Sequence, residues 1–234
     1  MLKLAFAWIA AAAFAASLGF FLYSYLVVFG QPDDPPRGTQ HAAASTAWNV
    51  LLFTIFALHH SLFARTGIKQ LVRDRVPAGL QRAIYTLVAS VLFVLVCWLW
   101  LPLPGDAWRL GSAWRWVGYA VQVTGILITF ISARALDVLD LAGVRQLSDA
   151  SRTDPILETR GVYGLVRHPV YFGWTLLVFG APDLTCTRLV FALVSTLYLM
   201  IAIPFEERSL LETFGPAYAS YQRKVRWRIV PWVY

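Results

Sequence analysis

Charged residues are scarce in this 234-residue chain, since Lys, Arg, Asp and Glu together make up only 14% of it, where a soluble domain carries about 25%. Two cysteines, Cys97 and Cys186, are too few for a disulfide framework and lack metal-ligand spacing, so we interpret both as packing residues. Four histidines are too few for a multi-histidine metal centre, and no metal site is predicted. The sequence also lacks a glycine-rich phosphate loop, a Ser-His-Asp set and a Cys-His pair.

Apolar residues take the place of the missing charges. Hydrophobic residues make up 58% of the chain and aromatic residues 15%, which excludes disorder, collagen and coiled coil and favours a protein whose solvent is a bilayer. A span needs about 20 apolar residues, and four uncharged runs meet that length: 4–29, 42–64, 83–103 and 116–133. The first run also has features of a cleaved signal peptide, but it is too long for one, which favours a retained span.

Two shorter apolar runs follow, at 170–181 and 189–205, separated by a turn that contains Pro182 and Asp183. The first of them is too short to cross a bilayer alone. We therefore predict that 170–205 forms a helical hairpin in the membrane. The predicted fold is an all-α integral membrane bundle in a single domain, 1–234, with about five spans, the last a hairpin, and short cytoplasmic helices at the C-terminus.

The net charge of +7 does not indicate a nucleic-acid partner, because the charges lie in blocks between the apolar runs. Sixteen of the 20 Lys and Arg residues fall at the N-terminus, in the loops 65–82 and 134–168, or in the tail from Arg208. The remaining four are Arg37, Arg109, Arg115 and Arg188. The positive-inside rule then predicts that both termini and the two long loops are cytoplasmic.

Polar chemistry meets the membrane edge at the two ends of the predicted hairpin. The run Arg167-His168-Pro169-Val170-Tyr171 begins it, and Glu206-Glu207-Arg208 follows its end. A hairpin brings its ends together, so we expect these groups in one site. Arginine suits a ligand carboxylate or phosphate, and carboxylates suit an amine, a ribose or a cation, while Tyr163 and Tyr171 offer flat rings. A structural Arg–Glu ion pair remains the alternative interpretation.

Other polar residues carry weaker hypotheses. His59 and His60 end the second span and are interpreted as structural or substrate-lining residues. Asp137 and Asp140 follow the fourth span, where they are expected to cap or solvate the helix end. The sequence Phe214-Gly215-Pro216 predicts that one helix ends and another begins, with Tyr218 and Tyr221 on one face of the second helix.

Two blocks of the sequence, one at each end of the predicted hairpin, resemble a known family. Residues 161–173 are similar to the signature G-x-Y-x-x-x-R-H-P-x-Y-x-G, and residues 206–225 are similar to E-E-x-x-L-x-x-x-F-G-x-x-Y-x-x-Y-x-x-x-V. Together they are typical of the isoprenylcysteine carboxyl methyltransferase and phospholipid methyltransferase superfamily. The resemblance covers roughly the last 75 residues, with the cofactor-site region at 155–234.

The resemblance implies S-adenosyl-L-methionine as cofactor, bound at the cytoplasmic mouth of the bundle. It implies that the cofactor is contacted by Glu207, by residues of the first signature and by Leu157 just before that signature. Arg167 is added because its guanidinium suits the carboxylate of the cofactor. The implied cofactor residues are Leu157, Tyr163, Arg167, His168, Pro169, Val170, Tyr171 and Glu207.

Two departures bear on the methyl acceptor. Prenylcysteine enzymes of the family have an Arg four residues before the cofactor Glu, where this chain has Ile203, and the family usually has Pro where this chain has Arg226. Residues 60–65 and 139–146 resemble motifs of the bacterial branch that contains methanethiol S-methyltransferases, although Leu139 stands where that branch usually has His. A prenylcysteine acceptor is disfavoured, and the resemblance implies a protein of the bacterial inner membrane.

The sequence thus predicts an S-adenosylmethionine-dependent methyltransferase in contact with the lipid bilayer, acting on a small or lipophilic thiol, amine, phenol or carboxylate. A neutral acceptor needs a proton acceptor, for which His168, Glu206 and His60 are candidates. Two alternatives stay open: a non-catalytic transporter or assembly factor with the same fold, and a nicotinamide-dependent membrane reductase. Cofactor binding separates the three.

Overall fold

The computed structural model describes residues 1–31, 41–64, 76, 78–134, 139, 142–148 and 156–234. The predicted caps Asp137 and Asp140, and most of the two basic loops, lie outside these residues. The chain divides into two compact units. Unit 1 comprises Met1–Gly105, Asp137–Thr153 and Thr185–Thr187, and unit 2 comprises Asp106–Leu136, Asp154–Leu184 and Arg188–Tyr234. That the whole chain forms one domain stays a prediction.

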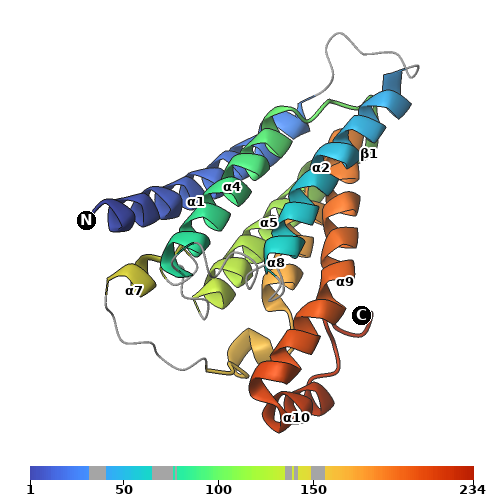
Figure 1. Ribbon diagram of the computed structural model, residues 1–234. Helices are drawn as coiled ribbons and strands as arrows, with labels where there is room; N and C mark the ends of the chain where they lie inside the picture. The colour runs from blue at the N-terminus through green and yellow to red at the C-terminus, as the bar shows by residue number, and fades with distance from the viewer. Residues whose placement is uncertain (32–40, 65–75, 77, 135–138, 140–141, 149–155) are drawn as a thin grey trace. The chain divides into compact units, whose positions relative to one another are not determined.

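Unit 1 is built from long apolar helices that pack side by side (Figure 1). Its elements are α1 (Leu2–Leu26), the 3-10 turn η1 (Val28–Gly30), α2 (Ala42–Ala64), α4 (Ala78–Trp98) and the short α7 (Val144–Leu147). Small buried residues, among them Ala7, Ala10 and Ala83, let the helices approach closely. Rings of Phe21, Tyr25 and Phe93 fill another part of the core.

The third span differs from its prediction of 83–103, because α4 runs from Ala78 to Trp98. Helix α4 begins before Arg82, because a long basic side chain near a helix end can extend to the interface between membrane and water. Pro102 and Pro104 lie just beyond the end and disfavour helix. The irregular segment after Trp98 is held by Asn49, whose amide nitrogen donates to the carbonyl of Leu101 at 2.8 Å and whose oxygen accepts from its N–H at 2.8 Å.

Unit 2 carries the rest of the fold. Its elements are β1 (Asp106–Arg109), α5 (Ser112–Ala133), η3 (Gly161–Gly164), α8 (Pro169–Phe179), β2 (Asp183–Thr185), α9 (Cys186–Phe214, nearly all in this unit) and α10 (Pro216–Lys224). The strands pair in a two-stranded sheet that the sequence did not predict. Helices α5 and α8 touch at glycines. A Cβ atom on Gly173 would lie 2.6 Å from the carbonyl oxygen of Gly125, and one on Gly125 would lie 2.5 Å from that of Gly173.

The predicted hairpin exists, with a longer second leg. Helix α8 has 11 residues, or about 16 Å, and is too short to span. Helix α9 starts before residue 189 and continues past the predicted end at 205 to Phe214, with Pro204 inside it. The predicted end was wrong because carboxylates end an apolar run without ending a helix. The legs are joined by the Trp174 indole N–H, which donates to the hydroxyl of Ser195 at 3.0 Å.

Within the described residues, five helical segments are long and apolar enough to cross a membrane: Leu2–Gly30, Ala42–Ser61, Gly79–Trp98, Ser112–Ala133 and Cys186–Phe214. Their polarity is arranged for a bilayer. Gln122 of α5 is buried and donates to the carbonyl of Leu177 at 3.1 Å, while Leu193, Leu197 and Ile201 of α9 are more than half exposed. The all-α membrane bundle with five spans is therefore confirmed, apart from the small sheet.

Candidate functional site

The first half of the site is set by the start of α8. Pro169 occupies the first turn of this helix, where its missing N–H costs nothing. The backbone N–H groups of the two preceding residues donate to the C-terminal segment. Arg167 N–H bonds the carbonyl of Trp227 at 2.9 Å, and His168 N–H bonds that of Arg228 at 2.9 Å. The last ten residues thereby hold the Arg-His pair in place.

The second half comes from α9, where Glu206 and Glu207 are consecutive. Successive residues of a helix point about 100° apart, so the two carboxylates differ in environment. The side chain of Glu207 is 7% exposed, whereas that of Glu206 is 43% exposed. One carboxylate is a core group and the other faces outward.

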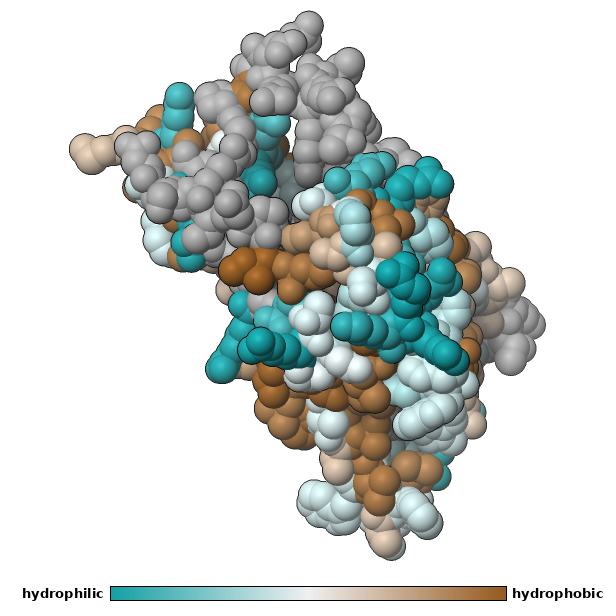
Figure 2. All heavy atoms as spheres, turned by 90° about the horizontal axis from the view of Figure 1, so that it is seen from below, coloured by the Kyte–Doolittle hydropathy of each residue, from teal (hydrophilic) through white to brown (hydrophobic). Residues whose placement is uncertain are grey.

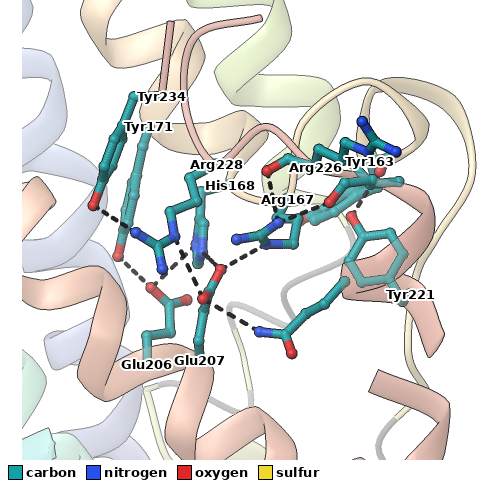
Figure 3. Close-up of polar contacts among 12 residues, drawn as sticks. Tyr163, Arg167, His168, Tyr171, Glu206, Glu207, Tyr221, Arg226, Arg228 and Tyr234 are labelled. Carbon is teal, nitrogen blue, oxygen red and sulfur yellow. Dashed lines mark hydrogen bonds and ion pairs between the residues drawn. The ribbon is translucent and has the colours of Figure 1, made fainter. Parts of the chain in front are cut away.

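Glu207 is the centre of a buried polar cluster, shown in Figure 3. Its Oε1 lies 2.6 Å from Arg167 Nε and 3.3 Å from His168 Nε2. Its Oε2 accepts from Gln222 Nε2 at 3.3 Å and lies 3.6 Å from Arg228 Nε. We call these five residues the Glu207 cluster. The predicted meeting of the Arg-His pair with the Glu pair, 40 residues apart, is confirmed.

The guanidinium of Arg167 is occupied by the protein itself. Its Nη1 donates to the carbonyls of Val225 and Arg226, both at 2.8 Å, in addition to the bond from Nε to Glu207. The side chain is only 8% exposed. The ion pair that was left open as an alternative is therefore present, and it fastens α8, α9 and the C-terminal segment to one another.

His168 lies between the two carboxylates. Its Nδ1 is 3.5 Å from Glu206 Oε2 and its Nε2 is 3.3 Å from Glu207 Oε1, so both ring nitrogens face acceptors and the imidazolium satisfies both. Burial alone would lower the pKa of His168, but hydrogen bonds to the two carboxylates raise it above its ordinary value. Tyr171 stacks on this ring at 5.3 Å and donates its hydroxyl to Glu206 at 2.8 Å.

This arrangement predicts a pH-dependent contribution to stability. A raised folded-state pKa means that the extra stability is fully present below the unfolded pKa of about 6.5 and is lost as the pH rises through the folded value. The groups that face His168 are Glu206, Glu207 and Tyr171. We expect the difference in unfolding free energy between the wild type and His168→Gln to shrink as the pH rises, measured in detergent by denaturant titration. A difference that grows with pH would contradict this.

Tyrosines and apolar residues pack next to the site, around α10. The Tyr221 hydroxyl donates to the carbonyl of Tyr163 at 2.6 Å, and the Tyr163 hydroxyl donates to that of Ser132 at 3.2 Å. Burial raises the pKa of all three tyrosines Tyr163, Tyr218 and Tyr221. As predicted, Tyr218 and Tyr221 share a face of α10, where they pack with Leu157. The hydroxyl of Tyr218 is buried and has no hydrogen-bond partner among the described residues.

The other candidate residues are placed as follows. Pro169 is buried and Val170 is half-buried at the start of α8. His60 belongs to unit 1, where its Nδ1 lies 2.9 Å from the hydroxyl of Tyr85 and its ring stacks on Phe56. The part of the chain that the structure describes holds no group of three or more His, Cys, Asp or Glu residues arranged to bind a metal ion.

Sequence reasoning missed two members of the cluster, Gln222 and Arg228. Gln222 is one of several polar residues on a short helix, and Arg228 was counted only toward membrane orientation. Arg228 is also held by Tyr234, whose hydroxyl accepts from Nη1 at 3.1 Å and whose ring lies 5.2 Å from the guanidinium. The alternation of charge and apolar residues near the C-terminus was the only available signal.

Known proteins are similar to this chain over most of its length. The phospholipid methyltransferase family matches residues 113–217, which include nearly all of α5, the whole of α8 and the two glutamates. The chain is 39% identical over 189 residues to a methanethiol S-methyltransferase of Pseudomonas deceptionensis, covering 76% of this chain and 70% of that protein. It is 36% identical over 181 residues to methanethiol S-methyltransferase 2 of Bradyrhizobium diazoefficiens, with the same coverage.

A methanethiol S-methyltransferase of Mycobacterium tuberculosis is 32% identical over 237 residues, covering 93% of this chain and 94% of that protein. No solved structure matches the chain. The described residues contain five helices that are long and apolar enough to cross a membrane, and the Glu207 cluster lies at the hairpin ends; the chain is an integral membrane methyltransferase. It belongs to the phospholipid methyltransferase family, in the branch that contains these bacterial relatives.

Proposed function

We propose that this protein transfers the methyl group of S-adenosyl-L-methionine to a small thiol, at the part of unit 2 that carries the Glu207 cluster. The observation that carries the proposal is the meeting of Arg167 and His168 with Glu206 and Glu207, one carboxylate buried and one exposed. The thiol is suggested by the three relatives reported above, all of which are named methanethiol S-methyltransferases.

The residues fit such a cofactor. Its methionine part carries an amine and a carboxylate, and the site offers the exposed carboxylate of Glu206 and the guanidinium of Arg228, whose side chain is 35% exposed. The buried hydroxyl of Tyr218 offers a further polar contact. We propose that Arg167 and Glu207 act chiefly by fixing the positions of the groups around them. To these three residues the proposal adds the set expected from the sequence: Leu157, Tyr163, Arg167, His168, Pro169, Val170, Tyr171 and Glu207.

S-adenosylmethionine supplies an electrophilic methyl group on a sulfonium centre. A neutral thiol must lose its proton as its sulfur bonds the methyl carbon and the bond from that carbon to the sulfonium breaks. His168 is a poor acceptor for this proton because its ring already faces two carboxylates and favours the protonated form. We propose that the proton passes through the carboxylate of Glu206 to water, because this side chain is 43% exposed and is held in place by Tyr171.

The replacement Glu206→Gln tests this role. General acid–base catalysis contributes about 10²–10⁴-fold, so we expect kcat for a small thiol, measured at saturating cofactor, to fall by at least about 100-fold. The affinity for S-adenosylhomocysteine should also fall, because Glu206 is the proposed partner of the cofactor's amine. The deficit should shrink at alkaline pH, where the thiolate forms without help. An unchanged kcat at neutral pH would remove Glu206 from the mechanism.

An apolar route to the acceptor is consistent with the chain. Ile203, at the position of the family's carboxylate-binding Arg, is fully buried and offers no charge to a prenylcysteine acid. A small thiol, or a lipophilic amine or phenol, can partition into the bilayer and enter between helices, where burial stabilises it by about 25 cal/mol per Å². The acceptor pocket is proposed to be lined from the membrane side.

The proposed orientation places both termini and the cofactor site in the cytoplasm of a bacterial cell, with the chain in the inner membrane. The basis is the sixteen-to-four distribution of Lys and Arg derived above. We expect a cytoplasm-active reporter fused after Tyr234 to be active and a periplasm-active reporter to be silent. The opposite pair of results would invert the topology.

One experiment decides among the functional classes. The purified protein is titrated with S-adenosylhomocysteine and, separately, with NADPH, and labelled S-adenosylmethionine is then offered with thiols, lipid amines, phenols and prenylcysteines. We expect binding of the adenosyl ligand only, and methyl transfer to small thiols. NADPH binding alone would favour the reductase, whereas no binding and no turnover would favour the non-catalytic alternative. Turnover of a prenylcysteine alone would contradict the interpretation of Ile203.

A further inference from the structure

The last eight residues form a tight structure that we call the C-terminal hook, residues 227–234. The carbonyl of Tyr234 accepts the N–H groups of Arg228 at 2.7 Å and Ile229 at 2.9 Å. The carbonyl of Val230 accepts those of Val233 at 3.1 Å and Tyr234 at 3.0 Å. Four backbone hydrogen bonds within eight residues hold the segment in one conformation.

At the tip of the hook, Trp232 adopts a left-handed backbone conformation with φ of 64°. Glycine or asparagine occupies this region readily, whereas a bulky side chain is strained there. The hook nevertheless presents the indole outward. Trp232 is 79% exposed and its neighbour Val233 is 77% exposed, while Ile229 at the base is buried. The hook has an apolar base inside the protein and a second apolar group held away from it.

The surroundings of the tip combine charge with apolar surface. Arg223, Lys224 and Arg226 lie just before the hook and are exposed. In Figure 1 the C-terminus lies beside the lower part of α9, and Arg228 Nε lies 3.6 Å from Glu207 of that helix. Helix α9 exposes Leu197, Ile201 and Phe205 as it approaches Glu206. Hydrophilic side chains gather in the middle of the face seen in Figure 2, with hydrophobic ones around them.

We propose that the C-terminal hook is a bilayer anchor, with Trp232 and Val233 inserted into the interfacial region of an anionic leaflet. An indole has an apolar body and one polar N–H, which suits the boundary between headgroups and acyl chains. The basic residues before the hook complement anionic headgroups. The proposal rests on the membrane location of the chain and not on the proposed methyl transfer.

The anchor is mechanically linked to the site. The carbonyls of Trp227 and Arg228, at the base of the hook, accept the backbone N–H groups of Arg167 and His168, and the side chain of Arg228 contacts Glu207. Lipid contact at the tip therefore stabilises the segment that positions the Glu207 cluster.

The test places a fluorescent probe at the tip. In a Cys97→Ser, Cys186→Ser background, Trp232→Cys is labelled with an environment-sensitive dye and the full chain is placed in lipid nanodiscs. Ala217→Cys, exposed on α10 in the same unit and not among the basic residues before the hook, is the matched control. Lipids with spin labels at the headgroup or deep in the acyl chain then quench the dye. The expected result is that headgroup labels quench position 232 at least about two-fold more than position 217, and more in anionic than in neutral lipid.

Two further measurements fix the interpretation. Trp232→Gly removes the indole and relieves the left-handed strain, so it should not weaken the fold, but it should make the enzyme less sensitive to added anionic lipid when thermal stability is followed. Equal quenching at the two positions would overturn the proposal. So would a blue shift of the dye that depends on protein concentration in detergent, because that would show a second copy of the chain covering the tip.

Discussion

Replacing Glu207 by alanine is expected to lower the free energy of unfolding by about 3–5 kcal/mol, the cost of removing one partner from a buried ion pair. The guanidinium of Arg167, with a side chain 8% exposed, would keep its charge and lose its counter-charge. Gln222 and His168 would each lose an acceptor on the same carboxylate. Affinity for S-adenosylhomocysteine should fall as well, because the position of His168 depends on this group.

The adjacent glutamate provides the control. Glu206→Ala removes the same charge from the next position of α9, but its side chain is 43% exposed and water can solvate the groups left behind. We expect a loss of unfolding free energy of less than about 1 kcal/mol, as for a surface ion pair. Both variants are compared by denaturant unfolding in the same detergent. Equal losses at the two positions would show that the Glu207 cluster is not the buried hub described above.

Gly173→Ala should be nearly as damaging, with an expected loss of about 3 kcal/mol, the upper part of the range for overpacking. The new methyl group would lie 2.6 Å from the carbonyl oxygen of Gly125 on α5. That atom belongs to the backbone, so the clash cannot be relieved by a change of rotamer and the helices must separate. Thermal unfolding in detergent and the yield of folded protein both report this loss.

Gly19→Ala is the matched substitution in α1, where nothing lies within 4 Å of the added atom. Because alanine favours helix over glycine by about 1 kcal/mol, this variant should be neutral or slightly stabilised. If Gly19→Ala and Gly173→Ala had the same effect, helix propensity rather than the contact between α5 and α8 would explain the loss.

The spans and the meeting of the two hairpin ends were predictable from the sequence, because charge-free runs and positive loops are properties of the chain alone. The end of α4 was not predictable from charge, since its position depends on Pro102 and on the bonds that Asn49 makes to Leu101. The continuation of α9 beyond residue 205 was missed because Glu206 and Glu207 end the apolar run without ending the helix. Apolar composition marks where a helix meets lipid and not where its hydrogen bonds stop.

Within the site, the types of residue were predictable, but the burial and the partners of each residue were not. Glu206 and Glu207 are indistinguishable in the sequence, and only packing decides which one is buried. Arg167 was interpreted as a ligand-binding fork, but three protein acceptors occupy it. Gln222 reaches the cluster from α10 and Arg228 from the segment after it, and the alternation of charged and apolar residues there does not indicate which side chain turns toward Glu207.

Asn49 makes two hydrogen bonds to the backbone of Leu101, one as donor and one as acceptor. One side chain supplies both a donor and an acceptor to one residue, as a neighbouring β-strand would do, so the amide of Leu101 should resist hydrogen exchange although it lies outside every helix. Replacing Asn49 with leucine would keep a side chain of similar size and remove both hydrogen bonds. Non-helical backbone can remain in an apolar setting only while such partners are present. Together with Trp48, which donates to the carbonyl of Leu99, and Thr187, which accepts from the N–H of Leu103, Asn49 allows the third span to be completed without a helix.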